Sequence, residues 1–217
     1  MSTLALFDAI RRIVQDELAR VRTAELAVVQ EQHPHASESD KDNHACTVRL
    51  RDTGLVLKRV PVATQRIGMV SIPAVGEMVL VQFVGGDINA PIIVGRLYND
   101  EDRPPPNDDG QMILHLPLAA GDDDAVHLEL HSGDKREMTL KLGSALTLSL
   151  KDDDPVVEID VDGGKAKLQI ARDGAVTLES QGALGIKAGS DVTLEGNAIT
   201  IEASGDLTLK GATVNIN

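Results

Sequence analysis

The C-terminal part of the chain repeats a short pattern that limits how it can fold. Pairs of aliphatic residues, each with one residue between its members, recur at offsets of 8, 8, 7, 8 and 7 residues. Alternation of this kind is typical of β-strands with one buried face, and a fixed step indicates a repeat architecture. A strand of four or five residues buries only two or three side chains, so one unit is too small to be stable alone. The pairs are Val176/Leu178, Leu184/Ile186, Val192/Leu194, Ile199/Ile201, Leu207/Leu209 and Val214/Ile216.

A looser form of the same pattern precedes these pairs. Residues 163–217 hold nine of the 19 glycines and no proline, which indicates that short strands end in tight turns. We therefore predict one β-rich shaft over residues 112–217. The earlier strand segments are Val126/Leu128/Leu130, Met138/Leu140/Leu142, Leu146/Leu148/Leu150, Val157/Ile159/Val161 and Leu168/Ile170.

The repeat length and the composition together favour a trimer. Eight residues per step leave no room for the longer coils of a single-chain β-helix, whereas three chains wound together can enclose a thin axis. No aromatic residue occurs from Asn99 to Asn217, which suits a narrow aliphatic interior. We predict an intertwined triple-stranded β-helix whose trimer core is the twelve paired residues from Val176 to Ile216. At about 4.8 Å per strand, eleven segments would give a shaft of about 50 Å.

Two further regions precede the shaft. Apolar residues three or four apart predict an amphipathic helix over residues 1–22, which either packs on its own domain or docks on a partner. Short alternating runs between glycine and proline residues predict a small all-β domain over residues 23–98. Three consecutive prolines mark residues 99–111 as a linker. The helical stripe comprises Leu4, Phe7, Ile10, Val14 and Leu18.

Charge and cysteine content exclude several classes of protein. The net charge of −13 lies entirely downstream of residue 98, and an acidic shaft does not favour nucleic acid. Cys46 is the only cysteine, so no internal disulfide can form. Neither a membrane span nor a signal-peptide profile is visible, so we expect cytoplasmic synthesis as a soluble protein.

The segment IPAVGEMVLVQFVGGDINAPIIVGRLYN, residues 72–99, resembles the VgrG-type OB-fold of contractile-tail spikes. The two glycine turns and the strand-opening Pro91 occur in register with that pattern. The full order of helix, OB-like domain, proline linker and glycine-punctuated repeats resembles phage baseplate assembly protein V. The resemblance implies a homotrimeric, membrane-piercing central spike of a contractile tail or phage-tail-like particle, in transient contact with the target envelope.

The resemblance also implies partners. The large hub-forming region that precedes the OB-fold in VgrG proteins is not seen in this sequence, so the resemblance implies a separate hub protein. The expected docking surface is the N-terminal helix or the OB face, and the helical docking residues are Leu4, Phe7, Ile10, Val14 and Leu18. The chain has no histidine after His131, so the iron-binding histidines that close some phage spikes are absent. We therefore expect a PAAR-like tip protein to cap the trimer at the residues Val214, Asn215, Ile216 and Asn217.

The residues do not point to catalysis or to a bound cofactor. Carboxylates are abundant but show no pairing with a nucleophile, and only about 27 residues separate the OB-like domain from the shaft, too few for an inserted lysozyme. We interpret the histidines His33, His35 and His44 as part of a solvated loop, and Cys46 as a core residue at the start of a buried strand. The aspartates of residues 122–124 and 152–154 are interpreted as charged loop tips. An axial site from His127 and His131 of three chains is a remote alternative. We predict no enzyme, no metal and no cofactor.

One alternative function stays open at this point. A trimeric β-helical adhesin or polysaccharide-binding tail fibre would share the repeat architecture. Such proteins usually expose aromatic rings that stack on sugars, and residues 99–217 contain none. The sequence therefore favours the spike over the fibre.

Overall fold

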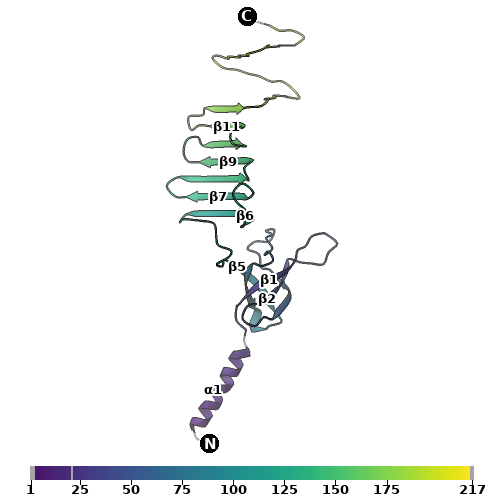
Figure 1. Ribbon diagram of the computed structural model, residues 1–217, viewed down its shortest axis with the longest axis vertical. Coiled ribbons are helices and arrows are strands. Elements are labelled where there is room, and N and C mark those ends of the chain that lie inside the picture. Colours follow the sequence, from purple (N-terminus) through teal and green to yellow (C-terminus); the bar gives the residue numbers. More distant parts are fainter. Residues whose placement is uncertain (1–2, 21, 216–217) are drawn as a thin grey trace.

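The computed structural model describes residues 3–20 and 22–215, with the side chains of residues 3–6 and 18–20 left outside the description. Figure 1 shows an elongated chain, with α1 at one end, a small barrel next, a stack of strands beyond it and a zigzag segment at the far end. The protein is mainly β, as predicted, with one helix and two antiparallel sheets.

Helix α1 spans Thr3–Arg20. The apolar stripe predicted from the sequence lies on it, and the side chains of Phe7, Ile10 and Val14 are exposed. Leu4 and Leu18 lie on the same helix, but their side chains are outside the description. Among the described residues, no helix has the length and apolar character that crossing a membrane requires.

A five-stranded antiparallel sheet follows, in the order β3-β2-β1-β4-β5. A parallel bridge from Val62 to Ile93 brings the chain after β3 against β5, which closes the sheet into a partly open barrel. This is the strand order and closure of an OB-fold. The strands are β1 (Glu25–His33), β2 (Ala45–Leu50), β3 (Val56–Pro61), β4 (Met78–Phe83) and β5 (Pro91–Leu97), with a short 3-10 turn at Val84–Gly86.

The barrel has a complete core of its own. Alternation along β4 buries Val79, Val81 and Phe83, while Gln82 faces solvent. Register shifts at three points bend the strands, as curvature of a small barrel requires. The core consists of Ala27, Val29, Cys46, Val48, Leu50, Val60, Val79, Val81, Phe83 and Ile93.

The second sheet is a meander of seven strands, in which each strand pairs antiparallel with the next along the chain. The sequence predicted strands here, but as layers wound from three chains; in the structure they pair within one chain over residues 111–180. The strands are β6 (Gln111–Leu116), β7 (Val126–Ser132), β8 (Arg136–Leu142), β9 (Leu146–Lys151), β10 (Val157–Val161), β11 (Ala166–Ile170) and β12 (Val176–Ser180).

Residues 181–215 form no strand in the structure, although the sequence predicted strand segments there. The strands of the meander shorten along the chain, from seven residues in β7 and β8 to five in β10, β11 and β12. The last strand, β12, has only two alternating aliphatic residues, Val176 and Leu178, and each repeat after it has the same number. A hairpin of such short strands carries too few ladder hydrogen bonds to persist alone. The chain therefore continues as the zigzag of Figure 1.

The loop between β6 and β7 is held against the turn between β8 and β9. The N–H of Gly143 donates to the carbonyl of Ala125 (2.8 Å), and the N–H of Ser144 donates to that of Asp123 (3.1 Å). Gly143 has a positive φ of 56°, and a Cβ at this residue would lie 2.4 Å from the Asp123 oxygen. A glycine is therefore required for the loop to approach this closely.

Replacing Gly143 by alanine should destabilise the sheet more than the same change at Gly163. Both residues have positive φ, but a Cβ at Gly163 meets nothing within 4 Å. We expect Gly163→Ala to cost about 1 kcal/mol from backbone conformation alone, and Gly143→Ala to cost more because the loop must also move. Denaturant unfolding of both variants measures the difference. Equal midpoints would show that the close contact does not constrain the loop.

Candidate functional site

The strand register of the second sheet gathers its aliphatic residues on one face. Leu128 pairs with Leu114 on one side and with Leu140 on the other, and such pairing continues through all seven strands. Because directly paired residues point to the same side of a sheet, each row is continuous. The central row is Leu114, Leu128, Leu140, Leu148, Ile159, Leu168 and Leu178.

Two further rows flank the central one on the same side. We call the three rows together the apolar face. One flanking row is Met112, Leu130, Met138, Leu150, Val157, Ile170 and Val176, and the other is Leu116, Val126, Leu142, Leu146, Val161, Ala166 and Ser180. Only the last of these 21 residues is polar.

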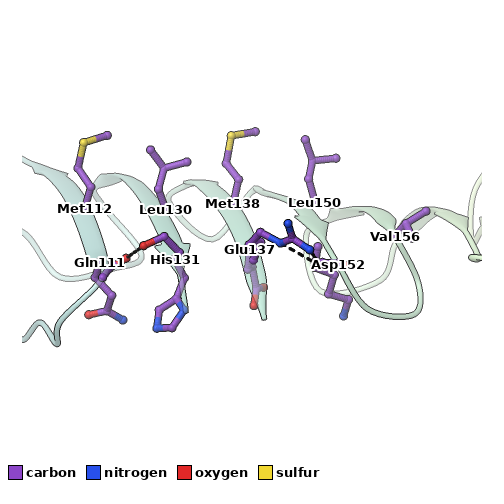
Figure 2. A pocket seen from close by; sticks show the side chains of 13 residues that line it. Gln111, Met112, Leu130, His131, Glu137, Met138, Leu150, Asp152 and Val156 are labelled. Atoms are coloured by element: carbon purple, nitrogen blue, oxygen red, sulfur yellow. Dashed lines mark hydrogen bonds and ion pairs between the residues drawn. The ribbon is translucent and has the colours of Figure 1, made fainter. Parts of the chain in front are cut away.

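The opposite face of the same sheet is polar. In Figure 2, Met112, Leu130, Met138 and Leu150 point to one side, while Gln111, His131 and Glu137 point to the other. Charged pairs such as Lys167 and Glu158 lie on this second face, with 3.3 Å between Nζ and Oε2. The sheet is therefore strongly amphipathic, with one face suited to water and one that is not.

Nothing in the described part of the chain covers the apolar face. Met112 at one end is 60% exposed and Leu178 at the other is 55% exposed. The whole chain exposes 16956 Å², about 1.8 times the area of a compact monomer of its mass, about 9,700 Å² by size scaling. A continuous exposed apolar face of this kind marks an interaction site.

The residues predicted as trimer core fall into two groups in the structure. Val176 and Leu178 lie in β12, on the apolar face. The residues from 184 to 214 lie in the zigzag segment, and Leu194, at 68% exposure, is typical of them. Ile216 lies outside the described residues. All the described members are exposed, namely Val176, Leu178, Leu184, Ile186, Val192, Leu194, Ile199, Ile201, Leu207, Leu209 and Val214.

The predicted docking residues lie at opposite ends of the molecule. Figure 1 places α1, with Phe7, Ile10 and Val14, at one end and the C-terminal segment at the other. Val214 and Asn215 are exposed there. The remaining predicted tip residues, Ile216 and Asn217, lie outside the described part of the chain. The two candidate docking surfaces are therefore separated by the barrel and the sheet.

Ion pairs connect successive turns along one edge of the second sheet. Asp152 binds both Arg136 and Arg172, with 2.7 Å between its Oδ1 and Nη2 of Arg172. The hydrogen bond and the charge of Arg136, with Arg172 in addition, lower the pKa of Asp152. Lys135 likewise lowers the pKa of Asp153 through a hydrogen bond of 2.5 Å. These aspartates were predicted as solvated loop tips; the structure shows that they also link turns.

The histidines near the barrel are not brought together with Cys46. His33 ends β1, is buried, and its Nε2 contacts Oγ1 of Thr47 at 2.8 Å. Its assignment to a solvated loop was therefore wrong, because β1 extends to this residue. His35 instead contacts Asp40 at 2.8 Å. Cys46 lies in the core as predicted, and burial raises the pKa of its thiol.

A different histidine pair, which sequence reasoning missed, lies on the polar face of the second sheet. His115 of β6 is the direct cross-strand partner of His127 of β7. From the sequence, His127 was considered only with His131, its neighbour along the same strand. Only the pairing register, which depends on the length and folding of the loop between the strands, reveals His115 as the closer partner.

The barrel matches a known protein family. Residues 40–98 match the family model described as the type VI secretion system/phage-baseplate injector OB domain. The matched segment contains β2 to β5, and β1, which pairs with β2 and β4, precedes it. The match includes all but the last residue of the segment 72–99, and it confirms that this segment resembles the injector OB domain. The match supports a structural role in a phage baseplate or a related injector.

The ion pairs at the sheet edge predict how stability changes with acid. The pKa of Asp152 is lowered in the folded state from its ordinary value of 3.8, so its stabilising contribution is present above that pH and is lost as the pH falls below it. Asp152→Asn should therefore lower the unfolding temperature at neutral pH, and the difference from wild type should disappear in stronger acid. Thermal unfolding between neutral pH and pH of about 2 measures this.

Asp134→Asn provides a matched control, because Asp134 is an exposed aspartate that forms no ion pair among the described residues. This variant should unfold like the wild type at every pH. If the two variants behave alike, the ion pairs at Asp152 do not stabilise the sheet.

Proposed function

We propose that three copies of this chain associate through the apolar face and form the central spike of a contractile tail or phage-tail-like injection system. The observation that carries the proposal is the uncovered apolar face, which extends over all seven strands of the second sheet. The injector OB domain supports the baseplate context in which such a spike would act.

A second and third copy of the chain are the partners that best fit this face. Copies offer the same aliphatic rows at the same spacing, so three sheets related by rotation can enclose one apolar axis. The absence of aromatic residues after Tyr98 favours such an axis, because aliphatic side chains suffice to fill it. The polar faces, with their acidic excess, would then all point outward.

The zigzag segment gives a second argument for association between copies. No backbone–backbone hydrogen bond occurs within the described residues 182–215. Backbone N–H and C=O groups that become buried need partners, and here they would have to come from another chain. Segments from three copies, interleaved along the axis, would supply these hydrogen bonds and cover the exposed aliphatic pairs. This is the intertwined arrangement that the sequence repeat predicts.

The function that follows is mechanical rather than enzymatic. A shaft whose ladder hydrogen bonds run along its axis spreads an axial load over many bonds. A hub protein would hold the trimer at α1, whose stripe at Phe7, Ile10 and Val14 is exposed. A PAAR-like protein would close the opposite end at Val214 and Asn215. On contraction the spike would be driven into the target envelope, and no cofactor is needed for that.

A charge in the centre of the apolar face should prevent trimer formation. Leu148 lies in the central row of β9, and Leu148→Asp would bring three carboxylates to one level of a dry axis. We expect native mass spectrometry in dilute solution to show a trimer for the wild type and no trimer for this variant.

Thr147→Asp is the matched control, because Thr147 lies on the polar face between Lys141 and Asp160. It should form trimers like the wild type. A stable wild-type monomer, or a normal yield of trimeric Leu148→Asp, would contradict the proposed role of the apolar face.

Removal of residues 1–21 tests the hub contact separately. Among the described side chains, none of α1 belongs to the barrel core, so the truncated chain should still fold and form trimers. It should, however, be absent from purified particles when it replaces the full-length protein, as measured by immunoblotting. Normal incorporation would show that the hub binds elsewhere, and failure to fold would show that α1 packs within the assembly instead.

A further inference from the structure

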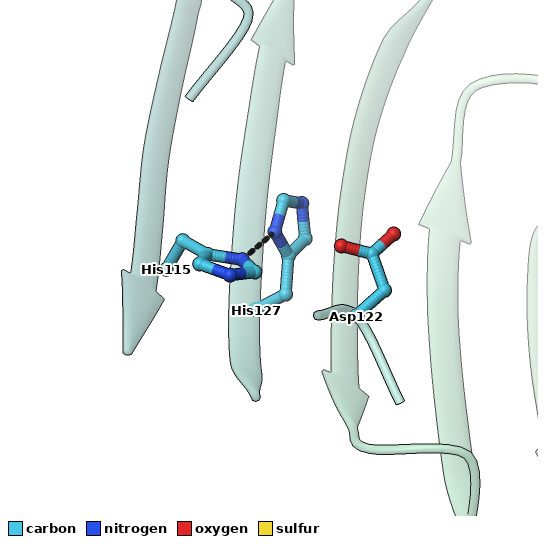
Figure 3. A group of neighbouring side chains, drawn as sticks. All are labelled: His115, Asp122 and His127. Atoms are coloured by element: carbon cyan, nitrogen blue, oxygen red, sulfur yellow. Dashed lines mark hydrogen bonds between the residues drawn. The ribbon is translucent and has the colours of Figure 1, made fainter. Parts of the chain in front are cut away.

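Three potential metal ligands meet on the polar face where the second sheet begins. Nδ1 of His115 lies 3.1 Å from Nδ1 of His127. One ring nitrogen of each histidine and a carboxylate oxygen of Asp122 form a group whose atoms all lie within 4.8 Å of one another. Figure 3 shows His115 and His127 on adjacent strands, with Asp122 beside His127. Both imidazoles are half-buried and Asp122 is exposed.

The hydrogen-bond partners determine which ring nitrogens carry protons. Nε2 of His115 lies 2.9 Å from the carbonyl oxygen of Ala120, which can only accept, so this nitrogen must donate. Nε2 of His127 faces a carboxylate oxygen of Glu129 at 3.5 Å, an arrangement that also favours a proton on Nε2. In two neutral rings, both Nδ1 atoms then carry lone pairs that point at each other.

Such facing lone pairs repel unless a cation lies between them. A proton fits on the line between the two nitrogens, whereas a metal ion bonded to both would lie to one side of that line, where the two lone pairs can converge on it. Two imidazole nitrogens bound to one tetrahedral zinc ion lie about 3.3 Å apart, given bonds of about 2.0 to 2.1 Å. The observed separation of 3.1 Å is close to that value. The backbone carbonyl and the carboxylate behind the two rings are also the partners that usually orient metal-binding histidines.

The third ligand lies on a constrained loop. Asp122 belongs to the segment between β6 and β7, which the amides of Gly143 and Ser144 fasten through Ala125 and Asp123. Ala125 is buried, so the loop is anchored beside the cluster rather than free to swing away. Only a small movement of the Asp122 side chain is needed to bring its carboxylate onto an ion held by the two imidazoles.

We propose that His115, His127 and Asp122 bind one divalent ion of the zinc class in each chain. Two imidazoles and one carboxylate suit zinc and neighbouring transition metals, whereas calcium and magnesium prefer oxygen ligands. A water molecule would complete the coordination. We expected no metal here from the sequence, because His127 and His131 are too far apart along their strand to share a site within one chain.

The ion would join three separate parts of the fold. It would tie the edge strand β6, its neighbour β7 and the intervening loop together where the sheet follows the proline linker. All three ligands lie within one chain, so the site does not depend on the proposed trimer. In a trimer three such ions would reinforce the base of the shaft from outside, because the cluster lies on the polar face.

The test uses the full chain, freed of metal with a chelator, and zinc chloride alone. Isothermal titration calorimetry should show one zinc ion per chain, with calcium chloride giving no heat of binding. His127→Asn and Asp122→Asn should each weaken zinc binding at least tenfold. Cobalt(II) substitution should give the visible absorption of a four-coordinate site, and this absorption should be lost in both variants.

His131→Asn is the matched control, because His131 lies on the same strand and the same face as His127. It should bind zinc like the wild type. Equal affinity in all four proteins, no binding to the wild type, or one ion per three chains would each overturn the proposal. Asp122→Asn changes only an exposed loop side chain, so the test holds even if His127→Asn fails to fold.

Discussion

The structure depends on one constraint, namely that a sheet with one aliphatic face must be covered by another layer. The OB barrel meets this requirement within the chain, because its five strands curve around ten buried residues. The second sheet does not, because it is a single layer with its three aliphatic rows open to solvent. The barrel therefore buries its core within one copy, whereas the apolar face of the second sheet would be buried in the proposed trimer.

The same constraint explains where the intrachain sheet ends. From β6 to β12 each strand finds its neighbour along the chain, and hydrogen bonds within the chain are sufficient. Beyond Ser180 the alternation of aliphatic residues continues, but with only two per repeat. The side chains still require burial, while the described residues 182–215 form no backbone–backbone hydrogen bond among themselves. The two needs can be met together by interleaved copies, so the intertwined region would begin where self-pairing stops.

Much of this fold was predictable from the sequence, because alternation depends only on neighbouring residues. It predicted the strands of the barrel and the aliphatic side of each strand of the second sheet. It could not predict that β6 to β12 pair within one chain, since hairpins and wound chains bury the same alternating residues. His33 was misassigned because its burial comes from an extension of β1 that pairs with β2. The approach of His115 to His127 depends on cross-strand register, which no local pattern reveals.

The two ends of the second sheet differ in how their edge strands are protected, and this difference suits a load-bearing shaft. An unpaired edge can pair with unintended chains. At β12 the exposed edge continues into the zigzag segment, where pairing with sister copies is the proposed outcome. At the other end, β6 is preceded in the chain by the linker that contains Pro104, Pro105 and Pro106, and these prolines cannot donate backbone hydrogen bonds. The loop bearing Asp122 and the histidine pair across β6 and β7 gather at this second edge. Fastening this edge would keep axial force from peeling the first strand away from the sheet.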